Sequence, residues 1–268
     1  STLAARARQA SDPAVYTRPM RVMMLSWEYP PRIVGGISPH VYDLSQQLVK
    51  PGIEVHVVTK HTPLAPDEEV EPSGVHVHRV HLDETPNDFL HEIQLLNDAT
   101  EDRVRLLLED WRRGGQPTVF HAHDWLSLDA ARTLKYEYSL PMVATVHATE
   151  EGRNQGIHNE MQRYIHEQEY WLTYEAWRTI VCTEYMKGEV ARSFNVPVDK
   201  IDVIYNGVVA SKFEFEWTEE EHAAWRLKFA KPMNRSSCTW AGLCARRAST
   251  CCSMRPAPSL LDSRRPGS

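Results

Sequence analysis

Short runs of apolar, β-branched residues alternate with segments of helical periodicity along most of the chain. Apolar strands separated by amphipathic helices are typical of a parallel sheet that helices cover on both faces. The pattern therefore predicts an α/β fold, a doubly wound Rossmann-like parallel sheet. Strands are predicted at residues 21–26, 53–58, 75–80, 118–121, 141–146, 179–182 and 201–204, and helices at 38–50, 89–111, 126–136, 160–177 and 184–193.

The first predicted helix has recognisable ends. Ser38 is its expected N-cap, Pro39 fits the first helical position, and Pro51-Gly52 ends it. In an open α/β sheet, ligands bind at the carboxyl ends of the strands. Functional residues are therefore expected in the loops that follow strands.

The pattern divides the chain into four segments. Residues 1–19 form a disordered lead-in, and Met20 is a candidate natural start. Residues 20–210 form the Rossmann-like domain, and residues 211–232 form a linker and helix. Residues 233–268 have little periodicity and are rich in arginine, cysteine, serine and proline, so they are predicted to be a disordered tail.

Composition excludes several classes of partner. The net charge is −6, whereas a nucleic-acid partner would favour a basic surface. No apolar run approaches the roughly 20 residues of a membrane span. The amino terminus does not have the pattern of a secretory signal. The sequence therefore predicts a cytoplasmic protein without nucleic-acid or membrane partners, and it does not indicate an oligomeric state.

Cysteine spacing argues against a structural metal. Four of the five cysteines lie in the tail, at Cys238, Cys244, Cys251 and Cys252, and no C-x-x-C pair is present. Structural zinc sites usually contain such pairs. We therefore expect no metal in the tail.

The loop after the first predicted strand, residues 27–37 (WEYPPRIVGGI), contains a glycine pair. Gly35 and Gly36 would let backbone amides approach an anion at the N-terminus of the following helix. A tight turn is the alternative explanation of the pair. The chain has no G-x-G-x-x-G motif, which argues against a dinucleotide-dependent dehydrogenase.

A second motif, residues 119–126 (VFHAHDWL), places His121, His123 and Asp124 at the end of a strand. Alternate strand residues share a face, so His121 could simply pack. A metal-dependent hydrolase that uses His121, His123 and His147 is another interpretation of the same residues.

Two further motifs follow later strands. Residues 145–156 (TVHATEEGRNQG) combine His147, Glu150 and Arg153 in one polar loop, which would open into the same crevice as the second motif. Residues 203–208 (VIYNGV) end the last strand with Asn206 and a glycine. By itself this Asn-Gly pair is only a turn signal.

Together the four motifs resemble the GT-B glycosyltransferases of the glycogen, starch and sucrose synthase kind, over residues 21–231. The resemblance implies the amino-terminal, acceptor-side half of a GT-B fold. It implies retaining transfer of a sugar, expected to be glucose, from ADP-glucose or UDP-glucose to a carbohydrate acceptor such as an α-glucan. It implies no cofactor and no metal.

The resemblance also assigns roles to residues. Gly35 and Gly36 would face the donor diphosphate. His147 would lie near the transferred sugar, and His147 and Asp124 are the expected catalytic residues. Bacterial glycogen synthases place a lysine two residues before the glycine pair, where this chain has Ile33; Arg32 is one position earlier and could supply the charge. The remaining assignments are Asp124 and His123 on the acceptor side of the cleft, Glu150 and Arg153 as further acceptor or sugar contacts, and Asn206 at the domain junction.

In this family a second Rossmann-like domain follows and grips the nucleotide. Its expected start coincides with Lys231-Pro232, where the pattern of this chain is lost. A back-translation of Asn234 to Arg255 with GC-rich codons permits, in a shifted frame, an apolar strand with the family's Val-Gly-Arg and Glu-Lys-Gly motifs. We therefore interpret residues 233–268 as a frameshifted tail and expect no turnover from this chain alone. A non-catalytic sugar-binding module is a third interpretation of the chain.

Overall fold

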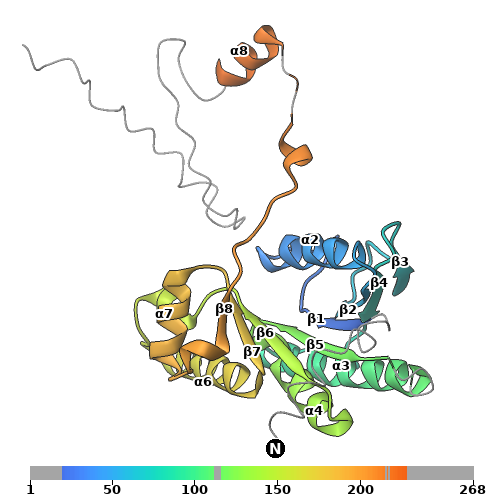
Figure 1. Cartoon of the computed structure of the whole chain (residues 1–268), viewed down its shortest axis with the longest axis vertical. Coiled ribbons are helices and arrows are strands. Elements are labelled where there is room, and N and C mark those ends of the chain that lie inside the picture. Colours follow the sequence, from blue (N-terminus) through green and yellow to red (C-terminus); the bar gives the residue numbers. More distant parts are fainter. Residues whose placement is uncertain (1–19, 112–115, 215, 217, 228–268) are drawn as a thin grey trace, which may run out of the picture. The chain divides into compact units, whose positions relative to one another are not determined.

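The computed structural model describes residues 20–111, 116–214, 216 and 218–227, and an eight-stranded sheet forms the centre of its first compact unit, which ends at Gly207 (Figure 1). The strand order is β3-β4-β2-β1-β5-β6-β7-β8. All neighbouring pairs are parallel except β3 with β4. The strands are β1 (Arg21–Leu25), β2 (Glu54–Lys60), β3 (Glu68–Val70), β4 (His76–Val80), β5 (Thr118–His123), β6 (Met142–Val146), β7 (Arg178–Val181) and β8 (Ile201–Val203).

The predicted α/β fold class is confirmed, and each predicted helix is present with small changes of its ends. The longer helices are α2 (Ile37–Val49), α3 (Phe89–Trp111), α4 (Leu128–Tyr138), α6 (Glu160–Glu175), α7 (Glu184–Ser193) and α8 (Glu219–Leu227). Shorter helical segments are η2 (Trp125–Ser127), α5 (Glu150–Asn154), η3 (Val198–Lys200) and η4 (Ala210–Phe213). The chain separates into two compact units after Gly207, and the sheet belongs to the first.

Two predictions about elements were wrong. The sheet has one strand more than the predicted seven, because the short antiparallel β3 was missed. Its sequence, Glu-Glu-Val, carries too little apolar character to be recognised as a strand. The second error concerns the start of α2, whose N-cap is Gly36 and not Ser38, and whose first residue is Ile37 and not Pro39. Ser38 is buried and donates its hydroxyl to the carbonyl of Arg32 at 3.1 Å, so it ties down the preceding loop.

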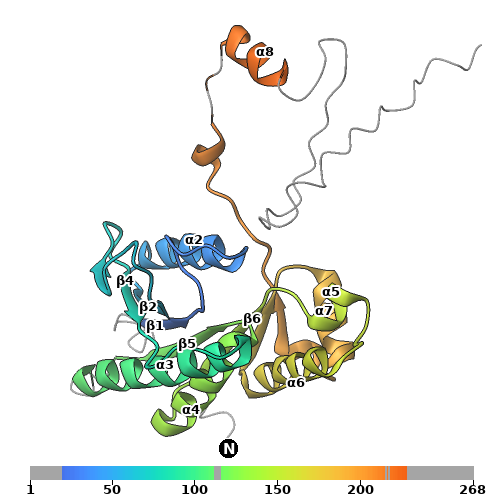
Figure 2. The same ribbon diagram turned by 180° about the vertical axis from the view of Figure 1, so that it is seen from behind.

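Alternation along β1 produces a separate apolar core on each face of the sheet. Met23 and Leu25 face one core, which α3, α4 and α6 cover; Val22 and Met24 face the other, which α2 covers. Figures 1 and 2 show α2 on one side of the strands and α3 and α4 on the other. Helices on both faces explain why every residue of β1 is buried.

The lead-in at residues 1–19 and the tail at residues 233–268 lie outside the described residues, so the predictions made for them stay predictions. Within the described residues, no helix is long and apolar enough to cross a membrane.

One buried amide joins three elements on the α3 side. Asn97, in α3, donates to the carbonyls of Ile93 at 2.7 Å and Leu126 at 2.9 Å. Its Oδ1 accepts from the backbone N–H of Ala130 at 2.9 Å. Ser127, the N-cap residue of α4, makes no side-chain cap bond. Asn97 therefore satisfies the first turn of α4 from a neighbouring helix.

We expect Asn97→Ala to lower the free energy of unfolding by about 2–3 kcal/mol, because it leaves the buried Leu126 carbonyl and Ala130 amide without their partner. Urea denaturation followed by circular dichroism measures the loss. Gln94→Ala, on an exposed position of the same helix, is the control and should change stability by less than about 0.5 kcal/mol. Equal losses in the two variants would contradict the cross-helix cap.

Candidate active site

The site lies where the strand order reverses. From β1 the chain first builds outward through β2 and β4, and then returns to place β5 on the other side of β1. At such a switch point the two neighbouring loops diverge to opposite faces of the sheet and leave a crevice. The loops that follow β1, β5 and β6 meet at this edge, and they contain three of the four motifs.

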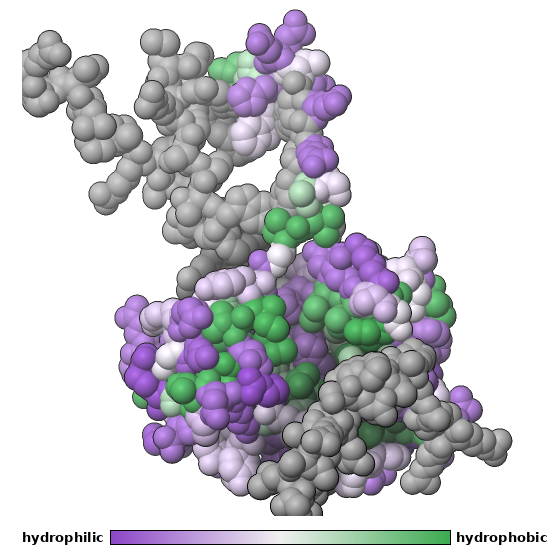
Figure 3. Space-filling model, in the orientation of Figure 1, coloured by the Kyte–Doolittle hydropathy of each residue, from purple (hydrophilic) through white to green (hydrophobic). Residues whose placement is uncertain are grey.

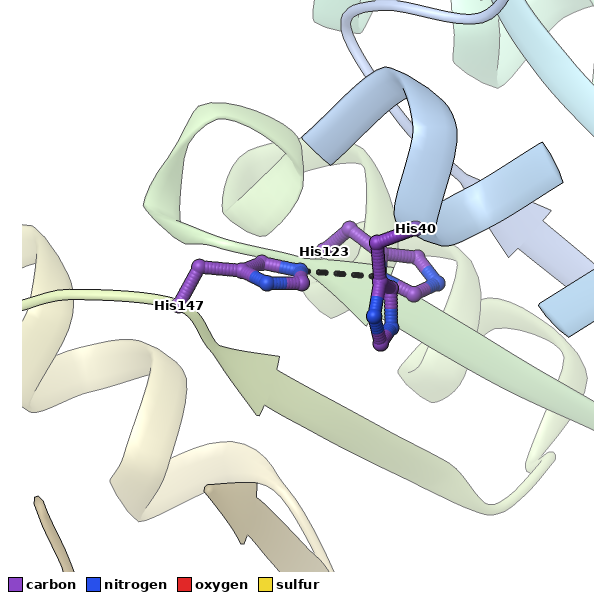
Figure 4. Close-up of side chains that lie close together, drawn as sticks. All are labelled: His40, His123 and His147. Atoms are coloured by element: carbon purple, nitrogen blue, oxygen red, sulfur yellow. Dashed lines mark hydrogen bonds between the residues drawn. The ribbon is translucent and has the colours of Figure 1, made fainter. Parts of the chain in front are cut away.

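Three histidines from different elements converge in this crevice: His40 from α2, His123 from the end of β5, and His147 just after β6 (Figure 4). Nδ1 of His123 lies 3.3 Å from Nε2 of His147. The rings of His40 and His147 meet edge to face, with centroids 4.6 Å apart. The sequence analysis did not identify His40 as a site residue. His40 lies in the first turn of α2, four residues after Gly36, and therefore at the same edge of the sheet as the glycine pair.

These histidines are held neutral. Burial lowers the pKa of His40 and of His147 to about 4, and it lowers that of His123 well below its ordinary value. Nε2 of His40 and Nε2 of His123 are buried without a hydrogen-bond partner among the described residues. Because a neutral imidazole both donates and accepts, this cluster can bind hydroxyl groups of a ligand without adding charge.

The structure changes the predicted metal-binding set. Nε2 of His121 lies 2.8 Å from the hydroxyl of Thr145, and its ring is tilted by 30° against that of His123, with centroids 4.2 Å apart. Among the described residues, the group in the crevice with metal-ligand spacing contains His40, and His121 is not a member. A second such group, His61, Asp67 and His81, is more exposed.

Asp124 adopts a backbone conformation that residues other than glycine rarely adopt, with φ 60° and ψ 173°. Its Oδ1 accepts the backbone N–H of His147 at 2.8 Å. Burial raises its pKa to about 6. Asp124 thus fixes the loop that carries His147 to the end of β5, which explains why a strained backbone is kept there.

The glycine loop is organised around a buried carboxylate. Glu28, only 1% exposed, accepts the backbone N–H groups of Val34 and Gly35. The amide of Gly35 is therefore already occupied by an internal anion. Glu28 was missed as a site residue, although it stands in the E-x-P-P part of the motif; its role depends on a chain reversal between Glu28 and Gly35 that no local pattern reveals.

The N-terminus of α2 stays open. Gly36 makes no cap bond, the first turn has no acidic residue, and a methyl group added at Gly36 would meet no atom within 4 Å. Such a helix N-terminus attracts anions. The guanidinium of Arg32 contacts other groups than this helix end. It donates to the carbonyl of Trp27 at 2.7 Å, lies over the Trp27 ring, and is 3.8 Å from Glu92.

The polar loop after β6 forms the short helix α5 and not an irregular segment. Its N-cap Thr149 accepts from Gly152. The Glu150 carboxylate lies 3.3 Å from Arg153 and accepts from Asn154 at 2.8 Å. Glu150 is therefore buried among its neighbours, whereas the side chain of Arg153 is half exposed. Their predicted contact with an acceptor stays a prediction.

A buried carboxyl group binds the first residue of α5. Glu169, in α6, accepts the backbone N–H of Glu150 at 2.9 Å with both carboxylate oxygens. Burial raises its pKa to about 8, so the side chain is protonated near neutral pH. The α5 loop therefore rests on a group that changes charge close to physiological pH.

Asn206 closes the crevice from the end of the described sheet. Its Oδ1 lies 3.1 Å from Nδ1 of His40 and accepts from the thiol of Cys182 at 3.4 Å. The first contact places the proton of neutral His40 on Nδ1 and leaves its Nε2 as an acceptor. The structure thus brings Asn206 into the histidine cluster.

Known proteins match mainly the first compact unit of the chain. The sequence model of Glycosyltransferase Family 4 matches residues 34–212. An uncharacterized glycosyltransferase of Methanocaldococcus jannaschii is 36% identical over 207 residues, covering 77% of this chain and 51% of that protein. A glycogen synthase of Mycobacterium tuberculosis is 34% identical over 210 residues, covering 73% and 50%. The chain therefore spans about half the length of the curated relatives it matches.

Solved structures show the same fold. Sucrose-phosphate synthase of Thermosynechococcus elongatus superimposes with a TM-score of 0.56 at 19% identity, over 72% of this chain and 49% of that one. The HepE protein of Anabaena, solved with UDP and glucose, gives 0.53 at 13% identity, over 78% and 50%. The described sheet therefore has the fold of one half of a GT-B protein, as predicted.

We expect Asp124→Gly to be more stable than Asp124→Ala by about 1–3 kcal/mol, because only glycine relieves the strained backbone. Both variants lose the bond to His147, so their difference isolates the strain. Urea denaturation of the two variants measures it. At Asp129, inside α4, the same pair should show the opposite order, since alanine is favoured over glycine by about 1 kcal/mol in a helix. If the alanine variant had the higher free energy of unfolding at both positions, the backbone of Asp124 would not be strained.

Glu169→Gln should become increasingly stabilising, relative to the wild type, as pH rises from about 4.5 to about 8. The raised pKa means that the fold binds a proton that the unfolded chain releases, so the wild type loses stability over this interval. Glutamine does not titrate and retains one acceptor for the Glu150 amide. Urea midpoints at pH 5 and pH 8.5 test this, with the exposed neighbour Glu167→Gln as control. A pH-independent difference would contradict the assignment.

Proposed function

The chain belongs to glycosyltransferase family 4, and on that premise we propose that it provides the acceptor-side half of a retaining glucosyltransferase. The donor is a nucleoside diphosphate glucose, UDP-glucose or ADP-glucose, and the acceptor is a hydroxyl of a carbohydrate such as an α-glucan. One observation carries the proposal. The open N-terminus of α2 and the neutral cluster of His40, His123 and His147 lie at the same switch point.

This arrangement supports separate roles for the two features. The free amides at the start of α2, next to Gly36, would stabilise the negative charge of the donor diphosphate as it leaves. The neutral imidazole of His147 would hydrogen-bond a hydroxyl of the transferred glucose and fix the orientation of the reacting carbon. Asp124 acts through His147, by fixing its loop. Glu28 holds the glycine loop in place, since it already occupies the amides of Val34 and Gly35.

We infer that transfer requires a second half that closes over this edge. Apolar side chains are exposed on the loops at this edge: Ile33 is 66% exposed and Ile204 is 56% exposed. Exposed apolar surface of this kind is typical of an interface with another domain. In Figure 3, apolar surface lies on both sides of a hollow in this face of the molecule. Within the described residues, Arg32, the one cation predicted to meet the diphosphate, is engaged with Trp27 and Glu92. The 268-residue chain by itself should therefore bind donor weakly and release no nucleotide.

Gly36→Ala should abolish most of this donor binding without loss of stability. The added methyl group meets no protein atom, but it projects from the N-cap position where the diphosphate would approach. Broadening of the ³¹P resonances of UDP-glucose and ADP-glucose by the chain measures the binding. Gly188→Ala, inside α7, is the control. Equal broadening by wild type and Gly36→Ala would contradict the placement of the diphosphate.

Turnover is measured in the same series. The DNA for residues 229–268 is sequenced, and any reading frame that continues into a second domain is expressed and assayed for UDP or ADP release. Release by that product and not by the 268-residue chain supports the proposal. Release by neither, with saturating donor and glucan, would contradict it.

A further inference from the structure

A polar pocket of about 610 Å³ lies between α3, η2 and α6, on the face of the sheet opposite α2. Trp125 and Tyr164 both line it, and their rings meet edge to face with centroids 6.4 Å apart. Trp125 is 7% exposed and forms part of the floor, while Tyr164 is 40% exposed and forms a wall. Trp125 directly follows Asp124, so the pocket adjoins the candidate active site through η2.

The charged side chains of the pocket are mostly acidic. Asp88, Asp98 and Asp129 line it, with Arg132 as the one guanidinium among its lining residues. Arg132 is not free, because it donates to Asp129 at 2.8 Å. Asp88 accepts the backbone N–H of His91 at 2.8 Å, which uses one of its two oxygens. The pocket therefore has a surplus of negative charge and would repel a phosphorylated ligand.

Several planar polar groups in the pocket are available to a ligand. Gln94, Asp98 and Gln168 line it, and none of them makes a side-chain hydrogen bond with another described residue. Amide and carboxylate groups beside an aromatic ring provide the donors, acceptors and apolar surface that a sugar ring requires. By contrast Asn97, also in the lining, has its donor and acceptor satisfied within the protein.

We propose that this pocket binds the acceptor of the transferase as an uncharged oligosaccharide, and that its acidic lining discriminates against phosphorylated sugars. The assignment rests on the proposed function, since it identifies the class of acceptor for that reaction. Tyr164 packs against the face of a sugar ring, and Gln94, Asp98 and Gln168 receive its hydroxyl groups.

The cations nearest the active-site end of α3 do not offer an alternative site for phosphate. Lys60 donates to Glu92 at 2.5 Å, and Arg32 lies 3.8 Å from the same carboxylate. A phosphate there would have to displace Glu92 from Lys60.

Direct binding to the 268-residue chain tests the proposal without any need for turnover. Isothermal titration calorimetry compares maltotetraose and cellotetraose with glucose 6-phosphate. We expect saturable binding of at least one tetrasaccharide and none of glucose 6-phosphate. Tyr164→Ala should weaken tetrasaccharide binding about tenfold, as for removal of a central aromatic contact. Tyr185→Ala, at a 73% exposed tyrosine of α7, is the control and should leave it unchanged.

A charge reversal provides a second test that does not depend on loss of binding. Asp98→Arg, at an exposed position, should allow glucose 6-phosphate to bind, with an affinity that falls as salt is added. No tetrasaccharide binding, tighter binding of glucose 6-phosphate than of both tetrasaccharides by the wild type, or unchanged binding by Tyr164→Ala would each overturn the proposal. Tyr164-dependent sugar binding with no nucleotide release from a completed enzyme would leave the pocket assigned and reject the proposed function.

Discussion

The parallel register of β1, β5 and β6 determines where every part of the site can be. Leu25 pairs with Ala122, and His123 pairs with Thr145, so the three strands end at the same edge. The loops that follow them must then share one crevice, and residues from opposite ends of the domain become neighbours. Alternation along β5 directs His121 and His123 to the α2 side, toward His40. The site is therefore a consequence of strand pairing and pleat.

Burial then decides the chemistry of these residues. The crevice keeps His40, His123 and His147 neutral, while it raises the pKa of Asp124 to about 6. Neutral hydrogen-bonding groups suit the hydroxyls of a sugar, and the open N-terminus of α2 offers partial positive charge without a side-chain cation. In the proposed reaction, the two features would bind different parts of a sugar nucleotide, the histidines its sugar and the helix end its diphosphate.

The two faces of the sheet have different uses. The α2 side carries the glycine loop and the histidines, and the α3 side carries the acidic pocket of Tyr164 and Asp98. Asp124 and Trp125, consecutive in sequence, connect them, because the strained backbone of Asp124 turns the chain from β5 into η2. If both proposals hold, donor and acceptor would approach this short segment from opposite faces of the sheet.

The sequence by itself determined the fold class, the order of the main elements and the sheet edge at which the motif residues gather, because apolar periodicity and strand-end motifs are local features. It also identified His123, Asp124 and His147 as neighbours. Only the tertiary structure decided that His40 and not His121 completes the cluster, that Glu28 occupies the amide of Gly35, and that Gly36 leaves a helix end open. Each of these depends on which side chain reaches a shared space across a chain reversal or a packed helix, and a linear pattern does not contain that distance.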